Sequence, residues 1–316
     1  MQNIDFESSM SADVIGKKKG ELIKSNVYIE YVRIIAAFGI VWFHSGVAGF
    51  QIAYSGLAAF IIITFFLETN RAPSRSLQIN VLATRLILPW LFWMALFAIY
   101  NVLRHKPALQ PTGNLATSVL YGSAPHLWYL PFVFALQTGY RAVRQAGGTR
   151  QVGYLCAFAV PLGFIFVNYW RPETITLGSP IAQYAQAILG VGFGILCSLA
   201  VQDRRWSLAL LVSVAATFTA FRVPGIGLPY LVALMCVAPA IIFGARADLK
   251  IANPSAISQL MYGVYLIHLP LIGLLKSEIH GPYLVTLVFL IACIVVWGMR
   301  RFGGIIGLTI TGGGKN

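Results

Sequence analysis

The stretch from Val27 to His44 reads VYIEYVRIIAAFGIVWFH and decides the fold of this chain. Its length approaches the roughly 20 residues that a helix needs to cross the hydrocarbon core of a bilayer. Glu30 and Arg33 are its only charged residues. Further apolar runs of this kind follow along the chain. The sequence therefore predicts an all-α, polytopic membrane protein with no second folded domain.

The composition excludes two common classes of protein. Of the 316 residues, 58% are hydrophobic and 10% are charged, whereas soluble domains contain about 25% charged residues. The formal charge of +13 does not indicate nucleic-acid binding, because Lys and Arg lie in short loops between apolar runs. The four cysteines lie singly within apolar runs, so we expect neither a disulfide nor a metal site.

The apolar runs predict ten transmembrane helices. We place them at about 27–47, 50–69, 80–103, 126–143, 152–170, 181–200, 207–221, 226–244, 257–276 and 282–302. Residues 1–26 are polar and include Lys17, Lys18 and Lys19, so we expect a disordered tail there and no signal peptide. Residues 303–316 are expected to form a second, short tail.

The distribution of positive charge predicts the orientation. Ten spans place both termini on the same side of the membrane. With the N-terminus in the cytoplasm, about 16 Lys and Arg residues fall in cytoplasmic segments and about 5 in outer loops. Cytoplasmic loops carry such an excess, so we expect both tails in the cytoplasm.

Arg33 and His44 of the first span share one face of the helix. They are eleven positions apart, which corresponds to three turns plus roughly 20° and a rise of about 16 Å. Glu30 lies one turn before Arg33 and can pair with it. Separately, Arg33 could be a snorkelling anchor and His44 a polar contact between helices. Together they favour a site that grips a phosphorylated donor and transfers protons.

Arg85 lies one turn inside the third span, four residues before Pro89. The proline can loosen the helix there and free a carbonyl. With Arg71 and Arg75 of the preceding loop, Arg85 would form a basic cytoplasmic mouth, and the alternative is again a membrane anchor. Glu68 is a candidate partner for one of these arginines.

Two later segments carry further candidates. His126, Trp128 and Tyr129 begin the fourth span, where aromatic residues serve either as an interfacial belt or as stacking surfaces for a sugar acceptor. Tyr265 and His268 lie in the ninth span. A structural hydrogen bond and a catalytic role remain equally open for His268.

Together these four segments resemble the acyltransferase-3 family, the membrane O-acetyltransferases of bacterial polysaccharides. The family's principal motif is similar to Arg33, ten residues and His44, with an acidic residue at the place of Glu30. The Arg85 segment is similar to a third-helix motif of stand-alone members, which lack a periplasmic hydrolase-like domain. His126-Leu127-Trp128-Tyr129-Leu130 and Tyr262-Gly263-Val264-Tyr265-Leu266-Ile267-His268 are similar to later signatures. The resemblance covers residues 27–302, which would form the transmembrane acyltransferase domain.

One segment departs from the family pattern. Late in the second helix the family often has Ser-Gly-Phe, whereas this chain reads Ile63-Thr64-Phe65-Phe66-Leu67-Glu68. The bulky Phe65 therefore stands where a small residue is usual.

The resemblance implies an enzyme of the bacterial inner membrane that uses acyl-CoA, most simply acetyl-CoA, as a co-substrate without a permanently bound cofactor. Arg33, Arg85 and Arg75 would bind the donor. His44, supported by Glu30, would act as a general base or as a covalent acyl carrier. The acceptor would be a hydroxyl of a polysaccharide or of a lipid-linked sugar.

His126, Trp128, Tyr129, Tyr265 and His268 would hold or support that acceptor. A transporter or flippase of a lipid-linked saccharide is the main alternative. A non-catalytic partner in polysaccharide assembly is another, and the oligomeric state is left open.

Overall fold

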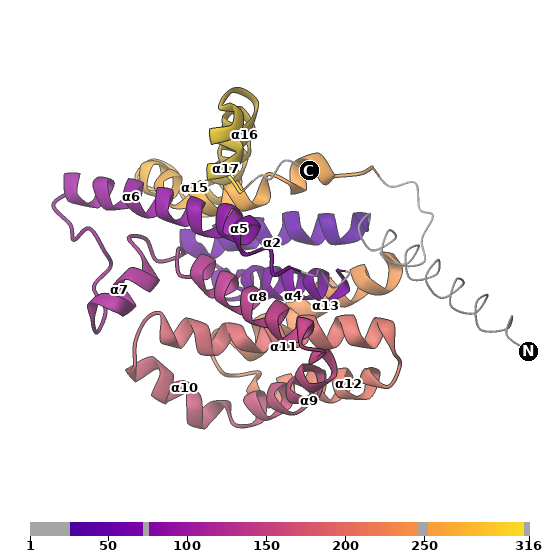
Figure 1. The fold of residues 1–316 in the computed structure, drawn as a ribbon. Coiled ribbons are helices and arrows are strands. Elements are labelled where there is room, and N and C mark those ends of the chain that lie inside the picture. The colour runs from indigo at the N-terminus through magenta and orange to yellow at the C-terminus, as the bar shows by residue number, and fades with distance from the viewer. Residues whose placement is uncertain (1–25, 72–75, 245–251, 313–316) are drawn as a thin grey trace, which may run out of the picture.

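The computed structural model describes residues 26–71, 76–244 and 252–312, and this part of the chain is helical with no strand (Figure 1). The predicted all-α class is therefore confirmed. The helices are α2 (Val27–Ser45), α3 (Phe50–Ala53), α4 (Ser55–Asn70), α5 (Ile79–Leu82), η1 (Ala83–Ile87), α6 (Leu88–Leu103), α7 (Leu115–Tyr121), α8 (Tyr129–Gln145), α9 (Thr149–Ile165), α10 (Val167–Thr176), α11 (Ile181–Gln202), α12 (Trp206–Thr217), η2 (Phe218–Ala220), α13 (Gly227–Gly244), α14 (Ser255–Ser258), α15 (Met261–Leu275), α16 (Gly281–Phe302) and α17 (Gly304–Ile310).

Each of the ten apolar runs contains at least one of these helices. Within the described residues, five helical segments are long and apolar enough to cross a membrane: Val27–Ser45, Phe50–Asn70, Ile79–Leu103, Ile181–Gln202 and Gly281–Phe302. Three shorter apolar helices cover Trp206–Ala220, Gly227–Ile242 and Met261–Leu275. The chain therefore has the character of a membrane protein, while ten spans and cytoplasmic termini stay predictions.

The helix predicted at 152–170 is divided into two by a sharp bend. Helix α9 ends at Ile165, α10 begins at Val167, and the two axes differ by 83°. Pro161 lies inside α9 and removes a backbone donor. The indole nitrogen of Trp170 donates to the Gly163 carbonyl across 2.7 Å, which holds the folded-back segment.

Two further helices lie where the sequence suggested loop or tail. Helix α7 starts at a capping box in which the Asn114 side chain accepts from the amide of Thr117. Helix α17 lies within the expected C-terminal tail and packs against α16 and α6. The Trp93 indole donates to the Ile310 carbonyl across 2.9 Å, so α17 is attached to the bundle.

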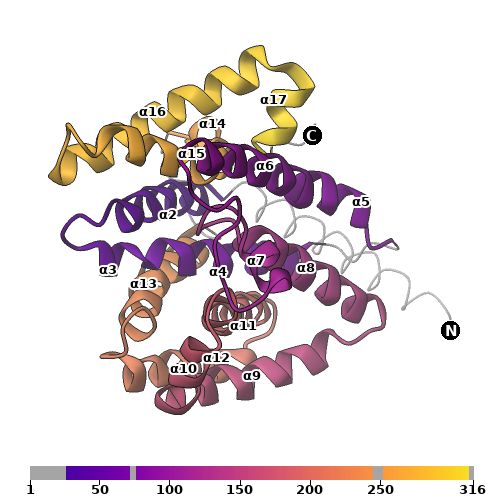
Figure 2. The same ribbon diagram turned by 90° about the vertical axis from the view of Figure 1, so that its left-hand side faces the viewer.

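Helices α2, α4 and α11 form the centre of the bundle. They lie between one layer containing α6, α15 and α16 and another containing α9, α10 and α12 (Figure 2). Gly56 of α4 brings the backbones of α2 and α4 together, because an added Cβ would stand 2.3 Å from the Ala36 carbonyl oxygen. Small residues permit such close helix packing in membranes.

Phe65 is accommodated by a glycine of a neighbouring helix. Its side chain is fully buried, and a Cβ added at Gly194 of α11 would stand 2.8 Å from the Phe65 Cβ. Helix α11 therefore supplies the small residue that the second predicted span lacks at this position.

Candidate functional site

Two cavities adjoin along α2. The first, which we call the basic cavity, has a volume of about 490 Å³. Its charged lining residues are Glu30, Arg33, Glu68, Arg71, Arg85 and Arg300. The second, which we call the aromatic cavity, has a volume of about 300 Å³. Its lining residues are Ile40, Phe43, His44, Tyr54, Leu57, Tyr121, Pro125, His126, Trp128, Gln183 and Tyr265.

The two cavities share one wall. Ile40, Leu57 and Tyr265 line both of them. Arg33 lines the basic cavity and His44 the aromatic cavity, so α2 carries one predicted residue to each. The helix face that Arg33 and His44 were predicted to share therefore runs along both the basic cavity and the aromatic cavity.

Arg33 is held by Glu30. Nη1 of Arg33 lies 3.1 Å from Oε2 and 3.3 Å from Oε1 of that carboxylate. The side chain of Arg33 is 28% exposed and that of Glu30 is 21% exposed, so the pair is open to the cavity. Nε and Nη2 of Arg33 make no hydrogen bond within the described residues, and they remain available to a ligand.

Arg85 lies in a local widening of the third predicted span. The segment Ala83–Ile87 is a π-helix, in which the amide of Leu88 reaches back to the Ala83 carbonyl. Pro89 has no amide hydrogen for the Arg85 carbonyl, which accepts instead from the Tyr262 hydroxyl at 3.2 Å. Over the part of the chain that the structure describes, the Arg85 guanidinium makes no hydrogen bond or ion pair.

The rest of the predicted basic mouth is partly observed. Arg75 lies outside the described residues. Arg71 lines the basic cavity, and its Nη1 lies 3.2 Å from Oε2 of Glu68. The main partner of Glu68 is Arg141 of α8, with Nε–Oε1 and Nη2–Oε2 distances of 2.6 and 3.0 Å. Glu68 is 3% exposed, so this bidentate pair is buried.

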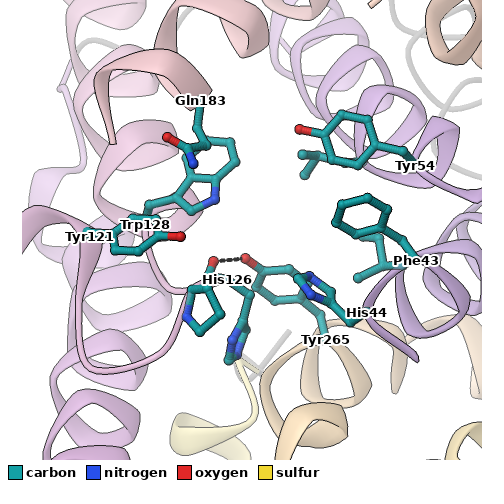
Figure 3. Close-up of a pocket in the computed structure, with 11 residues that line it drawn as sticks. Phe43, His44, Tyr54, Tyr121, His126, Trp128, Gln183 and Tyr265 are labelled. Carbon is teal, nitrogen blue, oxygen red and sulfur yellow. Dashed lines mark hydrogen bonds between the residues drawn. The ribbon is translucent and has the colours of Figure 1, made fainter. Parts of the chain in front are cut away.

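Three histidines from separate segments meet beside the aromatic cavity, and Figure 3 shows two of them, His44 and His126. The ring centroid of His44 lies 5.0 Å from that of His268 and 6.3 Å from that of His126, and the last two are 5.2 Å apart. The Tyr265 hydroxyl donates to the His126 carbonyl and ties α15 to the turn before α8. The spacing of residues in the sequence gave no sign of this cluster.

Hydrogen bonds fix the tautomers of two of these rings. Nε2 of His126 lies 3.3 Å from the Leu266 carbonyl, and Nδ1 of His268 lies 2.7 Å from the Tyr265 carbonyl. Because carbonyl oxygens only accept, these nitrogens carry hydrogen when the rings are neutral. The other nitrogen of each ring is then an acceptor, buried and without a partner among the described residues. His44 is the member of the cluster that lines the cavity without a hydrogen bond in this part of the chain.

The predicted acceptor-binding residues divide between the two cavities. His126 and Trp128 line the aromatic cavity, Tyr129 lines the basic cavity and Tyr265 lines both. His268 is fully buried behind them and lines neither. Among the described residues, no group of three or more His, Cys, Asp or Glu side chains is arranged to hold a metal.

Sequence reasoning missed several lining residues. These are Tyr54, Tyr121 and Gln183 of the aromatic cavity and Arg300 and Tyr262 of the basic cavity. Arg300 looked like an ordinary charge at the end of the last span, and only its position beside Arg33 and Arg85 sets it apart from Arg301. Tyr54, Tyr121 and Gln183 carry no pattern that would distinguish them from interfacial or packing residues, whereas Tyr262 begins the segment ending at His268 that resembles a family signature.

Comparison with known proteins identifies the class of activity. The acyltransferase-3 family model, described as an acyltransferase domain, matches residues 26–299. No curated protein and no solved structure matches the chain. The match covers most of the sequence and every residue that lines the aromatic cavity, whereas Arg300, Leu308 and Gly312 of the basic cavity lie beyond it, and it agrees with the apolar helical fold. On this evidence the chain belongs to the acyltransferase-3 family.

Proposed function

We propose that this protein transfers an acyl group, in the simplest case acetyl, from acyl-CoA in the basic cavity to a carbohydrate hydroxyl in the aromatic cavity. The observation that carries the proposal is the shared wall of the two cavities, with Arg33 on one side and His44 on the other. Polysaccharides or their lipid-linked precursors are the proposed acceptors. The bacterial inner membrane is the proposed location, with the basic cavity open to the cytoplasm.

The basic cavity suits the phosphate groups of CoA. Arg33, Arg71, Arg85 and Arg300 line it, whereas Glu30 and Glu68 are already engaged by arginines. Arginine binds phosphate oxygens through paired N–H groups, and Arg33 and Arg85 both have such groups to offer. The pantetheine arm spans roughly 15–20 Å by extended-chain dimensions. The rise from Arg33 to His44 is about 16 Å, so phosphates held at Arg33 allow the thioester to reach His44.

His44 provides the acid–base chemistry in this scheme. The neutral imidazole takes the proton of the acceptor hydroxyl while the hydroxyl oxygen attacks the thioester carbonyl. The C–S bond then breaks, and the departing CoA thiolate receives that proton. The unprotonated nitrogens of His126 and His268 are two further hydrogen-bond acceptors beside the His44 ring. In a covalent variant, His44 attacks the thioester, the C–S bond breaks and CoA leaves as the thiol with the imidazole proton; the acceptor hydroxyl then takes the acyl group and returns its proton to the imidazole.

Acetyl transfer by the full-length protein in nanodiscs tests the proposal. Radiolabelled acetyl-CoA and an envelope polysaccharide fraction are the substrates, and His44→Ala is expected to lower the rate at least a hundredfold. His280→Ala is the matched control, because His280 is exposed and lines neither cavity. A rate for His44→Ala close to that of the control would refute the role of His44.

The same assay separates transfer from transport. A flippase would move a lipid-linked sugar without consuming acetyl-CoA and would leave no label on the glycan. Glycan mass spectrometry of a deletion strain would then show no missing acetyl groups.

A further inference from the structure

We infer that the aromatic cavity admits one uncharged, hydroxylated ring at a time, such as a neutral hexose unit, and excludes acidic sugars. This inference rests on the proposed acyl transfer and specifies the acceptor for it. It is carried by the charge, the size and the polar groups of the cavity.

Among the described residues, the lining of the aromatic cavity contains no Asp, Glu, Lys or Arg. Arg171 of α10 lies within electrostatic range of Tyr54, but it donates to the Ala182 carbonyl across 2.9 Å and is not part of the lining. A carboxylate or phosphate entering the cavity would lose its hydration without meeting an opposite charge in the lining, which is unfavourable. By contrast, four arginines are among the described residues that line the adjoining basic cavity, and such a lining suits an anion.

The cavity volume fits a single ring. A water molecule takes about 30 Å³ in the liquid, so about 300 Å³ corresponds to roughly ten waters. A hexose has about a dozen non-hydrogen atoms, packed more tightly than separate waters. One ring therefore fits inside, whereas two rings, with about two dozen non-hydrogen atoms, would need more volume than the cavity has.

The walls offer both stacking surfaces and hydrogen-bonding groups. Figure 3 shows Trp128 and Gln183 on one side of the cavity and Tyr54 and Phe43 on the other, with the hydroxyl oxygens of Tyr54 and Tyr121 directed into the space between. Aromatic rings can cover the C–H faces of a sugar ring, while hydroxyls and amides pair with its hydroxyls. Histidine and tyrosine groups at the base, including His44, lie where a bound hydroxyl would be activated.

Gln183 is the side chain that we assign to selection by charge. Its Nε2 donates to the Ser179 hydroxyl across 2.9 Å, which orients the amide. Its Oε1 is buried and has no partner among the described residues. Because the amide is uncharged, a carboxylate beside this part of the wall would find no cation to pair with.

Matched pairs of simple glycosides test the inference with the wild-type protein. The full chain in nanodiscs receives radiolabelled acetyl-CoA and the methyl glycosides of glucose, galactose and mannose, each compared with its uronic acid. We expect at least one neutral glycoside to be acetylated at least ten times faster than its uronide. Equal or faster acetylation of the uronides would overturn the inference, as would consumption of acetyl-CoA with no transfer to any neutral ring.

Donor measurements distinguish this failure from failure of the proposed function. Binding and hydrolysis of acetyl-CoA are measured without an acceptor, and if neither occurs the proposed acyl transfer itself fails. Gln183→Arg adds a cation to the wall and should raise transfer to the uronide, relative to the neutral glycoside, at least tenfold while leaving acetyl-CoA binding unchanged. Gln202→Arg on the same helix is the control, since Gln202 is exposed and lines neither cavity. Equal transfer by these two variants would contradict the role of Gln183.

Discussion

The Tyr262 hydroxyl donates to the backbone carbonyl of Arg85 across 3.2 Å and joins α15 to the π-helical turn that carries this arginine. The carbonyl is free because Pro89 has no amide hydrogen to offer it. The bond links two segments 177 residues apart in the chain. It thereby fixes the backbone from which the unpaired guanidinium of Arg85 extends along the basic cavity.

Tyr262→Phe should weaken donor binding without impairing chemistry. The variant removes one hydrogen bond between neutral groups, worth about 0.5–1.5 kcal/mol, so we expect the KM for acetyl-CoA to rise about two- to tenfold. The value of kcat should stay within about twofold, since His44 is untouched. Tyr283→Phe is the control because Tyr283 is 79% exposed on α16. A fall in kcat with an unchanged KM would contradict the positioning role of Tyr262.

Arg300→Ala should lower the affinity for acetyl-CoA about tenfold, because it removes one of the four cations that line the basic cavity. Nε of Arg300 also donates to the Thr311 hydroxyl, and Nη2 donates to the Thr311 carbonyl. The neighbouring Arg301→Ala is the matched control, since Arg301 is exposed and lines neither cavity. Isothermal titration with acetyl-CoA measures both variants, and equal dissociation constants would show that Arg300 has no part in binding.

Glu68→Gln should destabilise the fold and affect binding only indirectly. The neutral amide leaves the Arg141 guanidinium in a buried place without its counter-charge, and breaking such a pair costs about 3 kcal/mol. We expect the thermal unfolding midpoint in detergent to fall by several degrees. Glu173→Gln, at an exposed position of α10, should leave the midpoint unchanged. A midpoint equal to that of the control would mean that the buried pair contributes little.

Local periodicity explains which parts of the site the sequence could predict. The positions of Glu30, Arg33 and His44 follow from the geometry of one helix, and the structure places them along adjoining cavities as that geometry requires. The freed carbonyl near Pro89 was also predictable, because it depends on residues four apart. The apolar runs likewise predicted where helices form.

Contacts between distant segments explain what the sequence could not predict. The sequence predicted that Glu68 pairs with an arginine of the basic mouth, and Arg71 does contact it. The bidentate partner of Glu68, however, is Arg141 of α8. No local sequence pattern distinguishes Arg141 from the other Arg and Lys residues at the ends of the predicted spans. The bend after α9 likewise depends on how Trp170 folds back onto Gly163, and apolar composition alone predicted a helix over 152–170 without indicating a bend.

The wall shared by the two cavities also bears on permeability. Two aliphatic side chains, Ile40 and Leu57, stand there with Tyr265. Aliphatic side chains offer no hydrogen-bonding group to water, so this wall disfavours a continuous file of water molecules between the two cavities. In the proposed reaction, the acyl arm would pass once these side chains change rotamer. The wall would then admit the acyl unit while it limits the leakage of protons and small ions.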